Sequence, residues 1–431
     1  MRSTLKSIFK ITTFILFLAG IILLISNIDR LIVPKEGFVS GNPYPGPSPY
    51  PGPEQGEPTA KAILKELPLC IFDGNSYSQN SEEFSVTSPQ YAPSNSRVAF
   101  AAEFNPENIQ WMPSGKQLLI TYTTSDKAGS RETMAFLDVF SGTIRVIGER
   151  QFTYAPPIWL DNQKSIAYIE PGEGGNYNIF TKQLIEAAKS AVIAQTSQPY
   201  LAIGPNESLT LFSQMGKAQI EIVDAKGSIQ TMLNTADLLS VPEWDFGPSL
   251  PQPGRFAWNS TFEKLAINSP KGLFFLDIKS GSICHINLGE QNQEKLWPYY
   301  VRWSPNNRYL AMLTTSGTGI VPFLNLTILD YLTGKLTQVF PDDSNATSNI
   351  YFTDITWSPD SQTIATLVGR GENTGNQLLF VDIATGNSKR VLPDANFYSG
   401  GVAGKLDWSP DGDHIAYICL KGPLCILDTN R

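Results

Sequence analysis

The chain has 431 residues, of which 42% are hydrophobic and 17% are charged. This apolar content can build a large core, so the chain is not disordered throughout, and its length allows about three average domains. Asp and Glu outnumber Lys and Arg by 40 to 32, and the resulting net charge of −8 excludes a general nucleic-acid binder.

Residues 1–33 have the pattern of a membrane signal anchor. Arg2, Lys6 and Lys10 precede an uncharged apolar run at residues 11–28. As a helix this run is about 27 Å long, close to the bilayer hydrocarbon thickness of about 30 Å. The basic flank favours a cytoplasmic N-terminus. We therefore expect one transmembrane helix, with the rest of the chain in the periplasm or at the cell surface.

A cleaved secretion signal is the alternative for this segment. It requires an A-x-A-like site just after the apolar run, and the sequence SNIDRLIVP that follows is a poor match.

Residues 34–67 begin with a Pro- and Gly-rich stretch in which the unit PYPGP occurs twice. Proline fixes φ, lacks an N–H and pushes its neighbour toward extended backbone, so this stretch is expected to be a semi-rigid linker. It would hold the following domain, residues 68–431, away from the membrane. A partner-binding proline motif is the alternative interpretation.

A repeated motif occupies most of the remaining chain. Its clearest copies read WSPDG at Trp408, WSPDS at Trp357 and WSPNN at Trp303, and each precedes a short apolar strand. The complete set of anchor positions is 111, 159, 203, 258, 303, 357 and 408, where the copy at Ile203 is degenerate. Their spacing of roughly 45 to 55 residues is typical of the blades of a β-propeller.

A second motif, a strand that ends in Asp followed by a turn with Gly, closes most units. It occurs at Asp138, Asp224, Asp277, Asp330 and Asp382, whereas the second unit has Lys182 at the expected place. Pro presets φ at a turn corner, Asp caps the turn through its side chain and Gly takes the left-handed position. The repeated aspartates are therefore interpreted as turn residues and not as calcium ligands or catalytic acids.

Each unit thus supplies four strands, and such sheets bury both faces only by stacking around an axis into a closed ring. We predict an all-β fold, a β-propeller of seven blades, or six if the copy at Ile203 is not a true unit. The last unit ends after its third strand, at Asp428. We expect residues 96–104 to supply its fourth strand and to close the ring.

The sequences WSPDGDHIAYI, WSPDSQTIATL and WSPNNRYLAML, with VDIATG, resemble the TolB-type, WD40-like propeller repeats of bacterial extracytoplasmic proteins. The resemblance covers roughly residues 96–431. It implies a periplasmic or cell-surface location and a role in binding a protein or another ligand. It assigns no individual functional residue, because the matching positions are turn and core residues.

The longer loops between units are expected to carry recognition, because variable loops on a rigid scaffold usually do. Aromatic residues suit either the hot spot of a protein partner or stacking on a sugar. The candidate partner-binding residues are Trp244, Phe246, Tyr154, Tyr351, Phe352, Phe397 and Tyr398. Trp244 and Phe246 are the preferred pair. We expect a membrane-tethered protein-binding or scaffold module, with a carbohydrate-binding or polysaccharide-active propeller as the alternative.

No catalytic, metal or cofactor site is predicted. The two histidines, His285 and His414, do not point to a common site, and no G-x-S-x-G motif is present. The four cysteines are Cys70, Cys284, Cys419 and Cys425. We expect buried free thiols; a bridge between Cys419 and Cys425, with Cys70 as another partner, is the alternative.

Overall fold

The repeats fold into sheets of four antiparallel strands, one sheet for each anchor. The computed structural model describes residues 69–72, 75–76, 81–85, 96–100, 106–126, 129–151, 153, 155–160, 164–184, 188–196, 201–204, 208–213, 219–224, 226–234, 256–269, 272–286, 288, 290–291, 294–316, 324–340, 350–370, 374–392, 406–418 and 424–429. The expected membrane anchor and linker lie outside these residues. Within the described part of the chain, no helix has the length and apolar character needed to cross a membrane.

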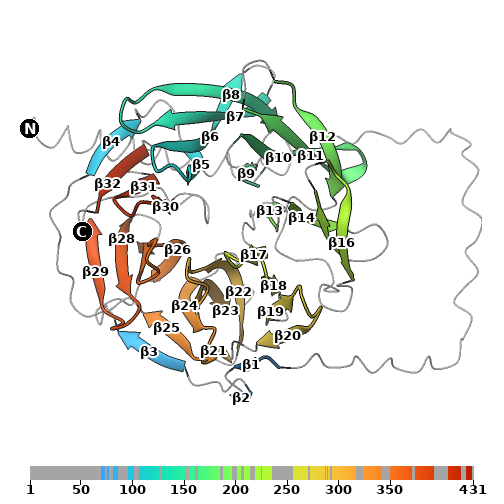
Figure 1. Cartoon of the computed structure of the whole chain (residues 1–431). Helices are drawn as coiled ribbons and strands as arrows, with labels where there is room; N and C mark the ends of the chain where they lie inside the picture. Colours follow the sequence, from blue (N-terminus) through green and yellow to red (C-terminus); the bar gives the residue numbers. More distant parts are fainter. Residues whose placement is uncertain are drawn as a thin grey trace, which may run out of the picture. The chain divides into compact units, whose positions relative to one another are not determined.

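Seven sheets surround a central axis, so the propeller has seven blades (Figure 1). Blade 1 contains β5 (Pro106–Trp111), β6 (Gln117–Asp126), β7 (Gly129–Asp138) and β8 (Ile144–Gln151). Blade 2 contains β9 (Ile158–Leu160), β10 (Ser165–Pro171), β11 (Tyr177–Gln183) and β12 (Ala191–Thr196). Blade 3 contains β13 (Leu201–Ile203), β14 (Leu209–Ser213), β15 (Gln219–Val223) and β16 (Ile229–Asn234). The degenerate copy at Ile203 is therefore a true blade, and the alternative of six blades is wrong.

The remaining blades follow the same order. Blade 4 contains β17 (Phe256–Trp258), β18 (Lys264–Ser269), β19 (Gly272–Asp277) and β20 (Ile283–Ile286). Blade 5 contains β22 (Glu294–Trp303), β23 (Tyr309–Ser316), β24 (Leu324–Asp330) and β25 (Leu336–Phe340), with β21 (Glu290–Gln291) beside β22. Blade 6 contains β26 (Ile350–Trp357), β27 (Thr363–Arg370), β28 (Thr374–Asp382) and β29 (Ser388–Leu392). Blade 7 contains β30 (Leu406–Trp408), β31 (His414–Ile418), β32 (Leu424–Asp428) and β4 (Ser96–Phe100).

Hydrophobic clusters between adjacent blades form the core. The residue eight positions after each anchor lies on the second strand and is buried in every blade; these residues are Leu119, Ala167, Leu211, Ala266, Ala311, Ala365 and Ala416. One cluster joins Leu118 of blade 1 to Ile426 of blade 7, and another joins Leu313 of blade 5 to Val381 of blade 6. Small side chains at this position let neighbouring sheets approach closely, as dense packing requires.

Most anchor tryptophans donate their indole N–H to the preceding blade. Trp303 Nε1 lies 2.9 Å from the carbonyl oxygen of Ala257, and Trp357 Nε1 lies 3.1 Å from that of Arg302. Each acceptor is the residue just before the anchor of the preceding blade. The tryptophans therefore do more than pack, because they also fix the position of one inner strand against the next.

In blades 5, 6 and 7 the first turn has the predicted chemistry. In blade 6, Ser358 Oγ donates to Asp360 Oδ1 at 2.6 Å and accepts the backbone N–H of Thr363 at 2.9 Å. In the five blades where it is described, the fourth residue after the anchor adopts positive φ, and Gly412, at +85°, is the ordinary choice. Ser361 and Phe262 adopt the same conformation at +63° and +55°, although side chains with a Cβ disfavour it.

The ring is closed at the seam between blades 7 and 1. As predicted, β4 pairs with β32 and completes blade 7, over the registers Leu424↔Phe100 to Leu427↔Ser96. On the inner side, Asp407 Oδ2 accepts the backbone N–H of Trp111 at 2.8 Å, and the Asp407 carbonyl accepts the Trp111 indole at 3.1 Å. The seam is therefore held at both its outer and its inner edge.

The carboxylate of Asp407 also contacts blades 5 and 6. Arg302 lies 3.5 Å from Asp407 Oδ1, and Thr356 Oγ1 donates to the same atom at 3.4 Å. Burial raises the pKa of Asp407, and the Arg302 guanidinium opposes that shift. The repeat motifs did not single out Asp407. One sequence signal for Asp407 was available. It is an acidic residue directly before an anchor, at a position where three other units have the apolar residues Ile158, Ala202 and Ala257.

The segment before the first blade runs along the outer edge of the ring. Leu69 forms a parallel bridge with His285 in blade 4, β3 (Ser81–Ser85) pairs in parallel with β25, and β4 pairs with β32 (Figure 1). We call residues 69–85 the strap. Its first part, β1 (Ile71–Phe72), forms a small hairpin with β2 (Asn75–Ser76).

A disulfide joins the strap to blade 4. The Cys70 and Cys284 sulfurs are 2.09 Å apart, and the bond links residues separated by 214 positions. Cys425 is also disulfide-bonded, and its partner lies outside the described residues. The expectation of buried free thiols is therefore wrong. It failed because sequence spacing does not reveal that the strap passes β20, where Cys70 N donates to the His285 carbonyl at 3.1 Å.

The indole hydrogen bonds can be tested with a matched pair of variants. Trp357→Phe removes the bond to Arg302, whereas Trp159 Nε1 is buried without a partner in the described structure, so Trp159→Phe removes none. Both changes lose similar packing, so we expect Trp357→Phe to lower the free energy of unfolding by about 1 kcal/mol more than Trp159→Phe. Denaturant unfolding measures the difference. Equal losses would contradict an energetic role for the indole bonds.

Candidate interaction surface

The tight turns after the first and third strands of a blade lie on the same side of the ring, which we call the turn face; in blade 7 only the first of them is present, because β4 supplies its fourth strand. In most blades the first residue of the second strand lies opposite the aspartate that ends the third strand. In two blades the side chains at these positions are in direct contact. Lys264 Nζ lies 3.0 Å from Asp277 Oδ2, and His414 Nδ1 lies 3.0 Å from Asp428 Oδ1. The charge of Asp277 is therefore compensated locally by Lys264.

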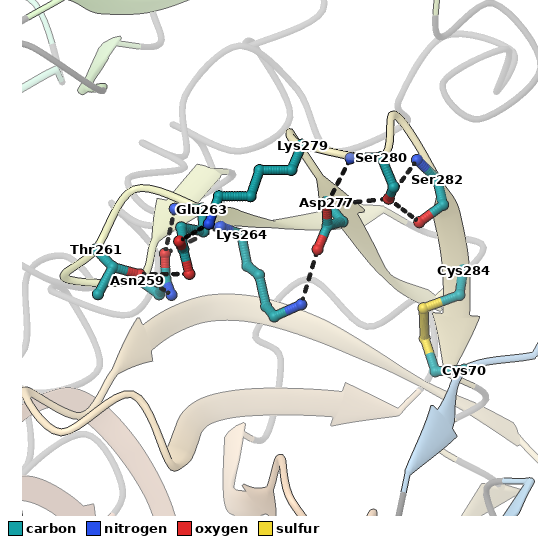
Figure 2. Close-up of polar contacts among 10 residues, drawn as sticks. All are labelled: Cys70, Asn259, Thr261, Glu263, Lys264, Asp277, Lys279, Ser280, Ser282 and Cys284. Carbon is teal, nitrogen blue, oxygen red and sulfur yellow. Dashed lines mark hydrogen bonds and ion pairs between the residues drawn. A yellow bond between two sulfur atoms is a disulfide. The ribbon is translucent and has the colours of Figure 1, made fainter. Parts of the chain in front are cut away.

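Blade 4 shows this arrangement most completely (Figure 2). Asp277 Oδ1 accepts the backbone N–H of Ser280 at 2.9 Å and its hydroxyl at 3.0 Å, while Asp277 Oδ2 contacts Lys264. A second pair, Lys279 with Glu263, lies beside it. The pKa of Asp277 is lowered to about 2, first by the Ser280 N–H and then by Lys264. Asp277 is thus an ionised turn cap, as the sequence motif predicted.

The second unit differs from the sequence interpretation. Ser165, which begins the second strand of blade 2, pairs with Gln183, so Gln183 occupies the place of the aspartate and not Lys182. Lys182 instead donates from Nζ to the Ile147 carbonyl of blade 1 at 2.7 Å. The motif is shifted by one residue here, and Lys182 links two blades.

Large apolar side chains are exposed on the turns and outer strands. Those in the blades are Phe140, Ile144, Val146, Val192, Ile229 and Leu332. Phe140 and Leu332 occupy the same place, two residues after the turn aspartate, where blade 4 has Lys279. Comparing this position among the repeats could have found them, but the recognition residues were expected on the opposite, long-loop side.

The residues predicted from the long loops are only partly described. Tyr154, Trp244, Phe246, Phe397 and Tyr398 lie outside the described residues, so their role remains a prediction. For Tyr351 only the backbone in β26 is described.

Phe352 is described fully and is only 1% exposed. It packs in the cluster between blades 5 and 6, with Ile355 and Leu379. Its side chain is therefore part of the core and is not available to a partner. The strand that contains it begins earlier than the loop interpretation assumed, and this places Phe352 within the sheet.

Glu132 is a fully buried acidic residue. Glu132 Oε2 lies 2.7 Å from Arg150, and Arg150 also donates to the Ala155 carbonyl at 2.7 Å. Burial raises the pKa of Glu132 and lowers the pKa of Arg150, while the attraction between the two charges opposes both shifts. Both side chains are sealed from solvent, so this pair holds the connection between blades 1 and 2 and cannot meet a substrate.

Among the described residues, no three His, Cys, Asp or Glu side chains gather as metal ligands would. No family model matches the chain. One of the subunits of eukaryotic translation initiation factor 3, from Dictyostelium discoideum, is 25% identical over 158 residues, which are 36% of this chain. The match spans only 20% of the length of that protein.

Several solved structures have a similar fold at low sequence identity. The β-propeller domain of Cps50 (Swd1) from Myceliophteria thermophila is 14% identical, with a TM-score of 0.48, over 76% of this chain and 97% of that domain. The β-propeller domain of the Trilobed protease from Pyrococcus furiosus is 12% identical, with a TM-score of 0.49, over 78% and 95%. A chain of the mitotic checkpoint complex is 14% identical, with a TM-score of 0.49, over 85% and 100%.

The role of Asp277 as a turn cap predicts a defined pH dependence. Because its pKa is lowered to about 2 in the folded chain, its stabilisation is present above the ordinary value of 3.8 and is lost as the pH falls toward 2. We expect Asp277→Ala to lower the free energy of unfolding by about 1 kcal/mol at neutral pH and by much less at pH 2.

The control for this measurement is Asp413→Ala, which removes an exposed carboxylate with no hydrogen bond in the described structure. Urea unfolding of the wild type and both variants between pH 7 and pH 2 gives the comparison. A loss for Asp277→Ala that stays constant with pH would show that the ionised carboxylate does not stabilise the turn.

Proposed function

We propose that this protein is a membrane-tethered, extracytoplasmic propeller that binds a protein partner. The observation that carries the location is the disulfide between Cys70 and Cys284. Disulfides persist in oxidising compartments and are rare in the cytosol. A location outside the cytoplasm also agrees with the sequence of residues 1–33, in which basic residues precede an apolar run.

Protein binding is supported by the surface of the ring. The blades hold one another through buried clusters and indole hydrogen bonds, so they form a rigid support for exposed side chains. On this support the exposed apolar residues Phe140, Ile144 and Val146 share one hairpin. Exposed apolar side chains gathered in one place are typical of protein interaction sites. The repeated aspartates, by contrast, are used as turn caps.

The location is tested by thiol trapping in cells. We expect the cysteines of the full chain to resist alkylation until a reductant is added, because they are oxidised outside the cytoplasm. A variant without residues 1–33 is the control, and its retention in the cytosol should leave the thiols free to react. Rapid alkylation of the full chain without reductant would contradict the proposed location.

The binding role is tested by pull-down with the full chain solubilised from membranes. The sequence-based candidates Trp244 and Phe246 are changed together to Ala, and the melting temperature is measured in parallel. We expect less partner to be recovered at an unchanged melting temperature. Equal losses of both would make the pair structural, whereas selective binding to a glycan array without any protein partner would favour the carbohydrate-binding alternative.

A further inference from the structure

The strap shows how this propeller binds an extended segment. Cys70 and Phe72 point into the ring, while Leu69 and Ile71 are exposed. The Phe72 ring lies 5.4 Å from that of Tyr331, at an interplanar angle of 89°. A Cβ added to Gly334 would lie 2.6 Å from Phe72 Cδ2, so the aromatic ring rests directly on this glycine.

The surface that receives Phe72 is formed by the second tight turn and the outer strand of blade 5. We call Tyr331, Gly334 and Leu336 the blade 5 seat. Leu336 pairs with Leu329, and both belong to the same hydrophobic cluster as Phe72, between blades 4 and 5. With the strap in place, Leu336 is only 3% exposed.

Blade 1 has the equivalent surface, and no segment in the described part of the chain pairs with its outer strand as the strap does with blade 5. We call Gly142, Ile144 and Val146 the blade 1 seat. Ile144 pairs with Leu137 in the same way that Leu336 pairs with Leu329. Leu137 lies in the cluster between blades 7 and 1, so Ile144 and Val146 are on the side of β8 that faces blade 7.

Exposure distinguishes the two seats. Ile144 and Val146 are 36% and 56% exposed, and a Cβ added to Gly142 would meet no atom within 4 Å. The blade 1 seat thus has the same construction as the blade 5 seat, but its apolar side chains face solvent. An occupant that covers these side chains would remove apolar surface from water, which favours binding.

Not every blade offers this surface. In blade 3, Ile229 occupies the corresponding place and is 51% exposed. However, a Cβ on Gly227 would lie 1.9 Å from the Ile193 carbonyl oxygen, because the outer strand of blade 2 covers the turn. Ile229 is therefore a control for Ile144: it is an exposed aliphatic residue at the same position, but the glycine of its turn is covered.

We propose that the blade 1 seat binds an extended segment of a partner protein that presents aliphatic or aromatic side chains at alternate positions. One large side chain of the segment lies over Gly142 and Ile144 of blade 1, as Phe72 of the strap lies over Gly334 of blade 5. This inference rests on the proposed protein-binding function and assigns it a surface and a ligand chemistry.

The test uses the full chain with its disulfides intact, so that the strap occupies the blade 5 seat. The probe is a fluorescent peptide with the sequence of residues 68–76 in which Ser replaces Cys70. Fluorescence anisotropy measures binding to the wild type, to a variant with Ile144→Thr and Val146→Thr, and to the control Ile229→Thr. Threonine is β-branched and suits a strand, and circular dichroism checks that each variant is folded.

We expect saturable binding that is weakened at least tenfold in the Ile144/Val146 variant and changed less than twofold in the control. A peptide in which Phe72 is also replaced by Ser should bind at least tenfold more weakly. Absence of saturable binding to the wild type, or equal binding to all three proteins, would overturn the assignment. If partner recovery persists while the peptide does not bind, this inference fails and the proposed function stands.

Discussion

Each blade must be held against two neighbours, and hydrogen bonds at the inner edge decide how the blades meet. The indole of Trp303 donates to the carbonyl oxygen of Ala257, the residue before Trp258, and that of Trp357 donates to the carbonyl oxygen of Arg302, the residue before Trp303. At the seam of the ring, Trp111 binds Asp407 through both its backbone and its indole N–H. Asp407 therefore links the first blade to the last, and its contacts with Arg302 and Thr356 extend this link to blades 5 and 6.

The outer edge is held by the strap, which precedes the blades in sequence. It pairs in parallel with β25, and the strand that follows it closes blade 7 as β4. The disulfide fixes its beginning to blade 4. Because residues 1–68 come before this bond, a pull on the N-terminal segment meets the Cys70–Cys284 link before it reaches β4.

The blades and their turns could be predicted from sequence because the same anchor and turn residues recur in most repeats. The anchor spacing and the capping aspartates follow from patterns within about 50 residues. The closing strand at Ser96–Phe100 could be predicted because the last unit ends after its third strand and needs a fourth. The strap, the disulfide and the role of Asp407 could not be predicted, because they join residues that the ring alone brings together. Asp407 and Trp111 are 296 positions apart. The exposed seat on blade 1 was missed for a related reason, since exposure depends on what the strap covers and is not visible in one repeat.

The central claim is that the blades form one closed ring whose stability depends on the seam between blades 7 and 1. Native-state hydrogen exchange on the full chain and on a chain without residues 425–431 tests it most directly, because the deletion removes most of β32, the strand that pairs with β4. If the ring is closed, protection should fall in all seven blades, including β14 and β18 far from the seam. Protection lost only in blades 7 and 1, with blades 3 and 4 unchanged, would contradict the account.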